Sequence, residues 1–124
     1  MTWGEVCRKY IGKRYNFESF NCRHLACAAF TDLTGYDANS MFGVGKNEGQ
    51  LKKLSRGDFK RLKKPSVELT VLTLKDAHGL THVALKRGND VLHNLGRDSF
   101  GQVSLSRWET VKSEWHHISH WVLK

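Results

Sequence analysis

The sequence lacks the features by which membrane proteins, secreted proteins and disulfide-stabilised proteins are recognised. It has a single proline and no apolar stretch near the roughly 20 residues that cross a bilayer. Its first residues lack the basic and then apolar pattern of a secretory signal. Its three cysteines are an odd number and form no C-x-x-C pair, which argues against a disulfide framework. We therefore expect reduced thiols, synthesis in the cytoplasm without a signal peptide, and no membrane span.

Length and charge narrow the possibilities further. With 124 residues the chain has room for one domain, which we place at residues 1–124, and not for a second catalytic domain. Acidic residues are comparatively few, since 20 Lys and Arg face 12 Asp and Glu and leave a net charge of +8. Such a charge attracts polyanions such as nucleic acid, anionic wall polymers or acidic lipids. Basic residues concentrate between positions 46 and 64. This segment could be an ordinary solvated face or a surface that contacts a polyanion, and the sequence leaves both interpretations open.

Two helices are predicted near the start of the chain. Thr2 and Glu5 have the spacing of a capping box, which predicts a first helix over about residues 2–12. Asn21 is a typical N-cap residue, and Gly35 is a typical helix stop. The helix between them carries an apolar stripe with several alanines, so we expect it to be the buried central helix.

The rest of the chain reads mainly as β-structure. Residues 36–50 are expected to form a loop, and residues 51–64 a helix broken at Gly57. After Pro65 the apolar residues alternate, and a phase change predicts a bulge or a strand end near Val71. Further segments are predicted as a hairpin around Gly88-Asn89 (80–86 and 90–95), a helical turn (106–113) and two short strands (102–105 and 118–123). Helices followed by an antiparallel sheet make an α+β protein.

Cys22 is the best candidate for a nucleophile. It falls in the first turn of the predicted central helix, where unpaired backbone N–H groups and the helix dipole favour thiolate over thiol. Cys27 lies too deep in the same helix for that effect, and Cys7 falls on the apolar stripe of the first helix. We expect Cys7 and Cys27 to be core thiols.

Two of the seven histidines lie on the predicted hairpin. If Arg87 faces Asp90 across the turn, His82 and His93 become diagonal neighbours on one face of the strand pair. A three-residue loop would separate them. With Cys22 they would form the set of a thiol hydrolase, in which one imidazole moves the proton and a second polar group orients it. As zinc ligands the three residues lack a short-spaced pair, so we do not expect a metal site.

Several motifs occur together in a recognisable order. They are Tyr15, seven residues before Cys22; Asn21-Cys22-Arg23-His24-Leu25; Thr81-His82-Val83-Ala84-Leu85; and Gly88-Asn89-Asp90-Val91-Leu92-His93. Leu95-Gly96-Arg97, Val103-Ser104-Leu105 and Trp108 follow. In this order the chain resembles the NlpC/P60 cysteine peptidases, and in particular their short phage-encoded, tail-associated members.

The resemblance implies a papain-like fold in which the nucleophile begins a central helix packed on a C-terminal antiparallel sheet. The implied reaction is hydrolysis of an amide in peptidoglycan stem peptides, with no metal or cofactor. Cys22 would attack, His82 would act as base and then acid, and His93 would orient His82. Tyr15 and Asn21 would lie beside the nucleophile and contact substrate. The implied partners are peptidoglycan or another anionic wall polymer and other phage tail proteins, so we expect a virion-associated protein made in the host cytoplasm.

The chain also departs from the family pattern. Asn21 replaces an acidic residue, and Arg23 and His24 replace a small residue and a glycine. The preceding loop has Glu18-Ser19-Phe20 in place of Gly-Gly. A bulkier, charged motif allows a different substrate or a loss of activity, although all three residues that the chemistry needs are present.

Three alternatives stay open. The chain could be a catalytically silent phage tail or assembly protein on the same fold. It could be a thiol amidase, deamidase or acyltransferase acting on another substrate, since these reactions use the same cysteine and histidines. A nucleic-acid binder would rest on the basic segment alone, without a recognised motif, so no specific nucleic acid is expected.

Overall fold

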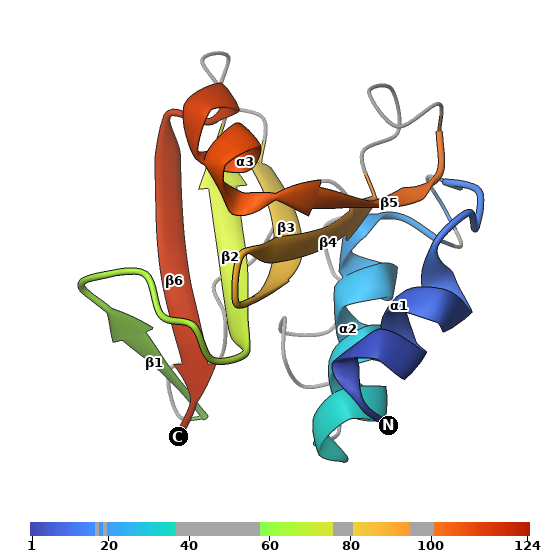
Figure 1. The fold of residues 1–124 in the computed structure, drawn as a ribbon, viewed down its shortest axis with the longest axis horizontal. Coiled ribbons are helices and arrows are strands. Elements are labelled where there is room, and N and C mark those ends of the chain that lie inside the picture. The colour runs from blue at the N-terminus through green and yellow to red at the C-terminus, as the bar shows by residue number, and fades with distance from the viewer. Residues whose placement is uncertain (17, 19, 37–57, 76–80, 95–100) are drawn as a thin grey trace.

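The computed structural model describes residues 1–16, 18, 20–36, 58–75, 81–94 and 101–124. Its elements follow in chain order: α1 (Trp3–Tyr10), α2 (Cys22–Thr34), β1 (Phe59–Leu62), β2 (Thr70–Lys75), β3 (Thr81–Arg87), β4 (Asp90–Asn94), β5 (Val103–Arg107), α3 (Trp108–Glu114) and β6 (His117–Leu123). In these ranges three helices accompany one six-stranded antiparallel sheet with the order β1-β6-β2-β3-β4-β5 (Figure 1). The predicted α+β class is confirmed. None of the described helices is long and apolar enough to cross a membrane.

Both predicted helix caps are present. The Thr2 hydroxyl accepts a hydrogen bond from the Glu5 backbone N–H, and the Glu5 carboxylate accepts one from the Thr2 N–H. The Asn21 side chain accepts from two backbone N–H groups of the first turn of α2. α2 ends at Gly35, whose φ of 75° lies in the left-handed region that glycine adopts without strain. α1 stops at Tyr10, two residues before the predicted end.

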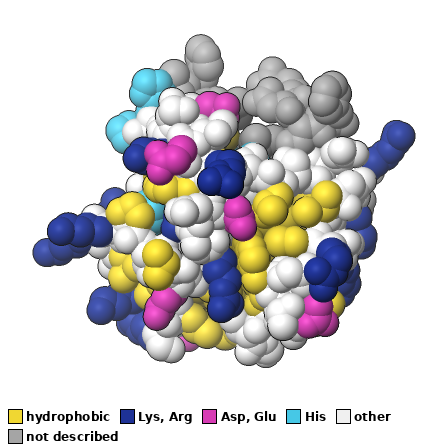
Figure 2. Space-filling model, in the orientation of Figure 1, with side chains coloured by type: hydrophobic (Ala, Val, Ile, Leu, Met, Phe, Trp, Pro, Cys, Tyr) yellow, Lys and Arg dark blue, Asp and Glu magenta, His cyan; other side chains and the backbone are white. Residues whose placement is uncertain are grey.

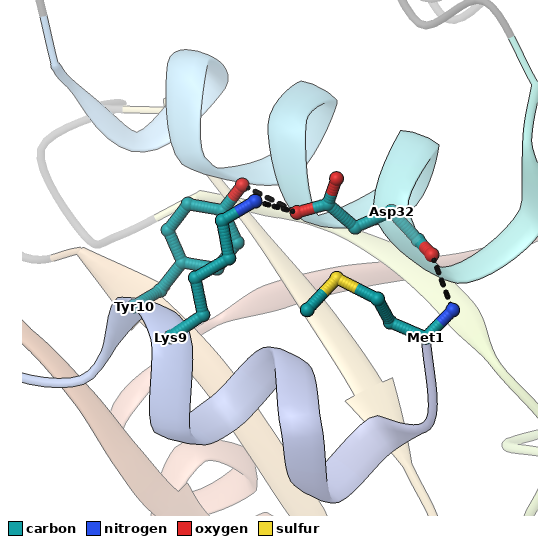
Figure 3. Close-up of polar contacts among 4 residues, drawn as sticks. All are labelled: Met1, Lys9, Tyr10 and Asp32. Atoms are coloured by element: carbon teal, nitrogen blue, oxygen red, sulfur yellow. Dashed lines mark hydrogen bonds and ion pairs between the residues drawn. The ribbon is translucent and has the colours of Figure 1, made fainter.

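A polar cluster ties α1 to α2 (Figure 3). One carboxylate oxygen of Asp32 accepts hydrogen bonds from the Lys9 ammonium at 2.8 Å and the Tyr10 hydroxyl at 2.6 Å. The N-terminal amine of Met1 donates to the Asp32 backbone carbonyl at 3.0 Å. Hydrogen bonds from Lys9 and Tyr10 lower the pKa of the Asp32 carboxyl below its ordinary value. Asp32 therefore anchors the beginning and the end of α1 on the same helix.

The sheet is covered on both faces. One apolar cluster joins residues of α1 and α2 to Val83 and Leu85 of β3, and we call this side the α2 face. A second cluster joins Trp108 and Val111 of α3 to Ala84, and we call this side the α3 face. Successive residues of a strand point to opposite sides, so neighbours in β3 belong to different clusters. Figure 1 shows α1 and α2 side by side on one side of the twisted sheet, with α3 at its upper end.

Two sequence predictions were wrong where tertiary packing overrides local pattern. Within the segment expected to be a broken helix, residues 59–62 form strand β1, which pairs with β6 and buries Phe59 in the core. Residues 51–57 of that segment, and 37–50 of the expected loop, lie outside the described residues. β2 carries no bulge or end near Val71, because it pairs without interruption with β3 and β6. It is buried on both faces, so its apolar residues do not alternate with polar ones.

The hairpin has the predicted turn. Arg87 pairs with Asp90, and Gly88 takes a φ of 60° that suits a glycine in a tight turn. β5, α3 and β6 follow as expected, although α3 is a helix of 7 residues rather than a single turn. The hairpin register decides where the histidines of the candidate site meet.

Candidate active site

Cys22 is the first residue of α2 and is partly buried against the cluster on the α2 face. Burial raises the pKa of its thiol above the ordinary value of 9.0, while hydrogen bonds from the backbone of Val83, Arg23 and Cys22 itself and the charge of Arg23 act to lower it. We expected the helix start to favour thiolate. The structure reverses that balance, because the cost of burying a charged sulfur exceeds the stabilisation by the amides.

The amides around the sulfur nevertheless form a definite site. Those of Cys22 and Arg23 belong to the open first turn of α2, where backbone N–H groups have no partner within the helix. That of Val83 comes from the beginning of β3. The Arg23 N–H, however, donates to the Asn21 side chain. The N–H groups of Cys22 and Val83, from two elements, therefore remain as the backbone donors that lower the pKa of the thiol. Such a set also suits the oxyanion that forms when a thiol attacks a carbonyl carbon.

Tyr15 lies near Cys22, where the resemblance placed it. Burial raises the pKa of the Tyr15 phenol, and the charge of a Cys22 thiolate adds to the effect, so the two side chains are close enough to interact. Asn21 is the N-cap that its position predicts, and its expected contact with substrate stays a prediction. Its amide oxygen accepts hydrogen bonds from the Arg23 and His24 N–H groups, and its own N–H donates to the His24 ring. Asn21 therefore holds the helix start that carries the nucleophile.

His82 and His93 meet, as the hairpin register predicts. Their ring centroids are 5.7 Å apart and their planes are tilted by 59°. The His82 ring also stacks on Trp115 at 5.3 Å. The Nε2 atom of His93 lies 2.6 Å from the hydroxyl oxygen of Ser106 on β5.

The sheet places these imidazoles on the side opposite Cys22. His82 pairs directly with Leu74, which belongs to the cluster on the α3 face. Its neighbour Val83 belongs to the cluster that contains Cys22. On β4, His93 likewise follows Leu92, which faces α2. The structure therefore brings the two histidines together but does not bring them to the thiol.

The physical reason is the pleat of the strand. Sequence spacing shows that His82 and His93 share a face of the hairpin, and it does not show which face α2 covers. The α2 face takes the odd-numbered residues of β3, so it receives the backbone of Val83 and not the ring of His82. The prediction that the three residues form one triad is not met in this arrangement.

His82 is held as a neutral imidazole. Burial lowers its pKa to about 3, and the nearby His93 contributes to the shift. Its Nε2 atom is buried and has no hydrogen-bond partner in the described part of the chain. The neutral ring could act as a base, but the Cys22 thiol that would give it a proton packs on the other side of the sheet.

Sequence reasoning missed Asn94, the polar residue that β4 contributes to the α2 face. It lies next to His93 and therefore on the other side of the strand, and only 1% of its surface is exposed. Its Nδ2 atom donates to the Phe20 carbonyl at 3.0 Å, directly before the N-cap of α2. Because a carbonyl can accept only from the amide nitrogen, the buried Oδ1 is left without a partner among the described residues. The alternation of strand residues could have indicated Asn94 once the covering helix was known.

Of the other two thiols, Cys7 is buried in the core as predicted, and Cys27 is partly buried and packs against it. Burial raises the pKa of Cys7, and it raises that of Cys27 to about 11. Among the described residues, no three His, Cys, Asp or Glu side chains are grouped so that they could hold a metal ion.

Comparison with known proteins leaves the family undetermined. No protein-family model and no curated protein matches the chain. The resemblance to a peptidase family therefore stays a prediction.

Proposed function

We propose that this protein is a cysteine hydrolase with Cys22 as nucleophile, acting on amide bonds of peptidoglycan stem peptides and associated with a phage particle. The observation that carries the proposal is the pair of backbone N–H groups, of Cys22 in α2 and Val83 in β3, that act to lower the pKa of the Cys22 thiol. The nearby phenol of Tyr15 adds a polar group on the same face, as does the amide oxygen of Asn94, which has no partner among the described residues. The papain-like arrangement and the wall substrate come from the resemblance of the motifs.

In this reaction the Cys22 sulfur attacks the carbonyl carbon of the amide. A sulfur–carbon bond forms, and the carbonyl oxygen takes the negative charge and accepts hydrogen bonds from the backbone amides. The carbon–nitrogen bond then breaks, and the amine leaves with the proton that the thiol gave up. Water hydrolyses the thioester and regenerates the thiol.

The proton transfer needs a base, and the proposal assigns this role to His82. Its backbone adjoins the Val83 N–H that acts to lower the pKa of the Cys22 thiol, while its ring packs on Trp115 across the sheet. A one-residue slip or a bulge at the first two residues of β3 would turn the ring to the α2 face, because a shift of one residue exchanges the two faces of a strand. That turn would break the pairing of His82 with Leu74. The proposal therefore includes a second arrangement of the start of β3.

A second candidate is a catalytically silent tail or assembly protein on the same fold. The observation that favours it is the separation of the thiol from both imidazoles by the sheet. A protonated thiol with a raised pKa and no adjacent base is unreactive at neutral pH. In such a protein the histidines serve the packing of α3.

Digestion of purified peptidoglycan distinguishes the two candidates. Wild type, Cys22→Ser, His82→Gln and Cys27→Ser would be incubated with the polymer, and the released muropeptides analysed by mass spectrometry. Cys27 is the matched control, since it is the other partly buried thiol of α2. The hydrolase predicts new termini with wild type and Cys27→Ser and none with the other two. Products that persist in Cys22→Ser, or no products from a folded wild type, would contradict it.

A further inference from the structure

The edge strand β1 and the residues after it carry an unbalanced positive charge. Residues 59–67 contain four basic side chains and no acidic one. The basic residues are Lys60, Arg61, Lys63 and Lys64, which we call the β1 basic edge, and all four are exposed. The neighbouring strand β6 has no acidic residue either.

No ion pair neutralises this charge within the described residues. The ion pairs found there are Lys9 with Asp32 and Lys112 with Glu109, both away from β1. The carboxylate just before the strand, Asp58, accepts a hydrogen bond from the Tyr36 hydroxyl at 2.6 Å. Figure 2 shows Lys and Arg side chains projecting from the flank on which Figure 1 places β1 and β6. The four side chains of the β1 basic edge are therefore exposed and not held in any described ion pair.

The shape of the charge indicates the kind of polyanion. β1 is an edge strand of the sheet and pairs with β6 alone among the described strands. Lys60 and Arg61 point to opposite sides of the sheet, and Lys63 and Lys64 follow the end of the strand. The charges therefore surround an edge instead of lining one face or a groove. A flexible linear polymer can follow such an edge, whereas a rigid duplex meets it only at a point.

We propose that the β1 basic edge binds a flexible anionic wall polymer that carries one phosphate in each repeat unit. The choice of a wall polymer as the polyanion rests on the proposed function, whereas the positive charge of the β1 basic edge is observed independently of that function. Lysines on an edge strand also prevent pairing with another chain. That protective role requires charge alone and no particular partner. Specific binding of a polymer by these four residues would therefore distinguish a binding site from a merely protected edge.

The test measures binding of the full chain to poly(glycerol phosphate) at about 50 and about 200 mM salt. The edge variant changes Lys60, Arg61, Lys63 and Lys64 to Gln. The control variant makes the same change at four exposed basic residues elsewhere, Arg8, Arg14, Lys75 and Lys112, so both variants have the same net charge. Circular dichroism and thermal melting show that each variant is folded. Cys22→Ser serves as a further background, so that binding is measured independently of any hydrolysis.

The edge variant should bind at least about tenfold more weakly at the lower salt concentration. Its plot of log affinity against log salt should flatten by roughly 0.7 for each phosphate that the variant no longer neutralises. The control variant should change by no more than about threefold. Equal weakening in both variants would mean that net charge alone attracts the polymer and would overturn the proposal, as would tighter binding of a single-stranded oligonucleotide or duplex DNA than of poly(glycerol phosphate). Binding that persists in Cys22→Ser, alongside no peptidoglycan cleavage by wild type, would reject the hydrolase and leave the edge site standing.

Discussion

Acid should destabilise the fold through His82. In the folded chain burial lowers the pKa of this imidazole from 6.5 to about 3. In the unfolded chain the ring takes up a proton below pH 6.5, so the unfolded state binds more protons between about pH 6.5 and about pH 3. Stability therefore falls as the pH falls through this window. The folded chain resists protonation of this ring because the proton would place a charge between Trp115 and His93, away from water.

The size of the effect follows from the two pKa values. If the folded ring stays neutral, its contribution to the free energy of unfolding falls by about 2 kcal/mol between pH 7 and pH 5. Asp32 does not interfere, because its pKa lies below the ordinary carboxyl value and its contribution is lost only at lower pH. His120 is also buried with a lowered pKa, so part of the pH dependence will remain without His82.

Urea unfolding at pH 7 and pH 5 measures this effect. His82→Gln replaces the ring with an amide that does not titrate, and its loss of stability between the two pH values should be smaller than that of wild type by about 2 kcal/mol. Comparison within each variant cancels the cost of the substitution itself. His117→Gln is the control, since His117 is exposed. The same pH dependence in wild type and His82→Gln would refute the burial of His82 as a neutral ring.

Two further substitutions test the supports of the candidate site. Asp32→Ala should lower the free energy of unfolding by about 1–3 kcal/mol, because it leaves the Tyr10 hydroxyl without its acceptor, whereas Lys9→Ala should cost less than about 1 kcal/mol because Lys9 is exposed. Equal effects in urea unfolding would contradict this ranking. Asn94→Ala leaves the Phe20 carbonyl without its donor and should cost about 1–3 kcal/mol, and a change below about 0.5 kcal/mol would mean that this bond does not hold the start of α2.

The parts of the fold that the sequence predicted are those with local causes. The caps of α1 and α2 depend on side chains within three residues of the helix start, so Thr2 and Asn21 could be identified without a structure. The hairpin depends on Gly88-Asn89, and its register follows from the turn. The contact between His82 and His93 was predictable for the same reason.

The remaining features depend on contacts between distant segments. Phe59 lies in a strand because β6, at the other end of the chain, offers it a partner and α2 covers it. The continuous burial of β2 reflects helices on both faces of the sheet, which no pattern within β2 reveals. The side on which α2 packs decides whether His82 or Val83 meets Cys22, and this choice belongs to the packing of the whole sheet.

The central structural claim is that Cys22 lies at the start of α2 and is separated from both imidazoles by the sheet. The most direct test is the rate of Cys22 alkylation by iodoacetamide as a function of pH, measured by peptide mapping in wild type and His82→Gln. We expect a midpoint above 9.0 for the free protein, because burial raises the pKa of the thiol, and the same midpoint in both proteins. A midpoint below 9.0 that moves upward in His82→Gln would contradict this claim and place the His82 ring beside the thiol.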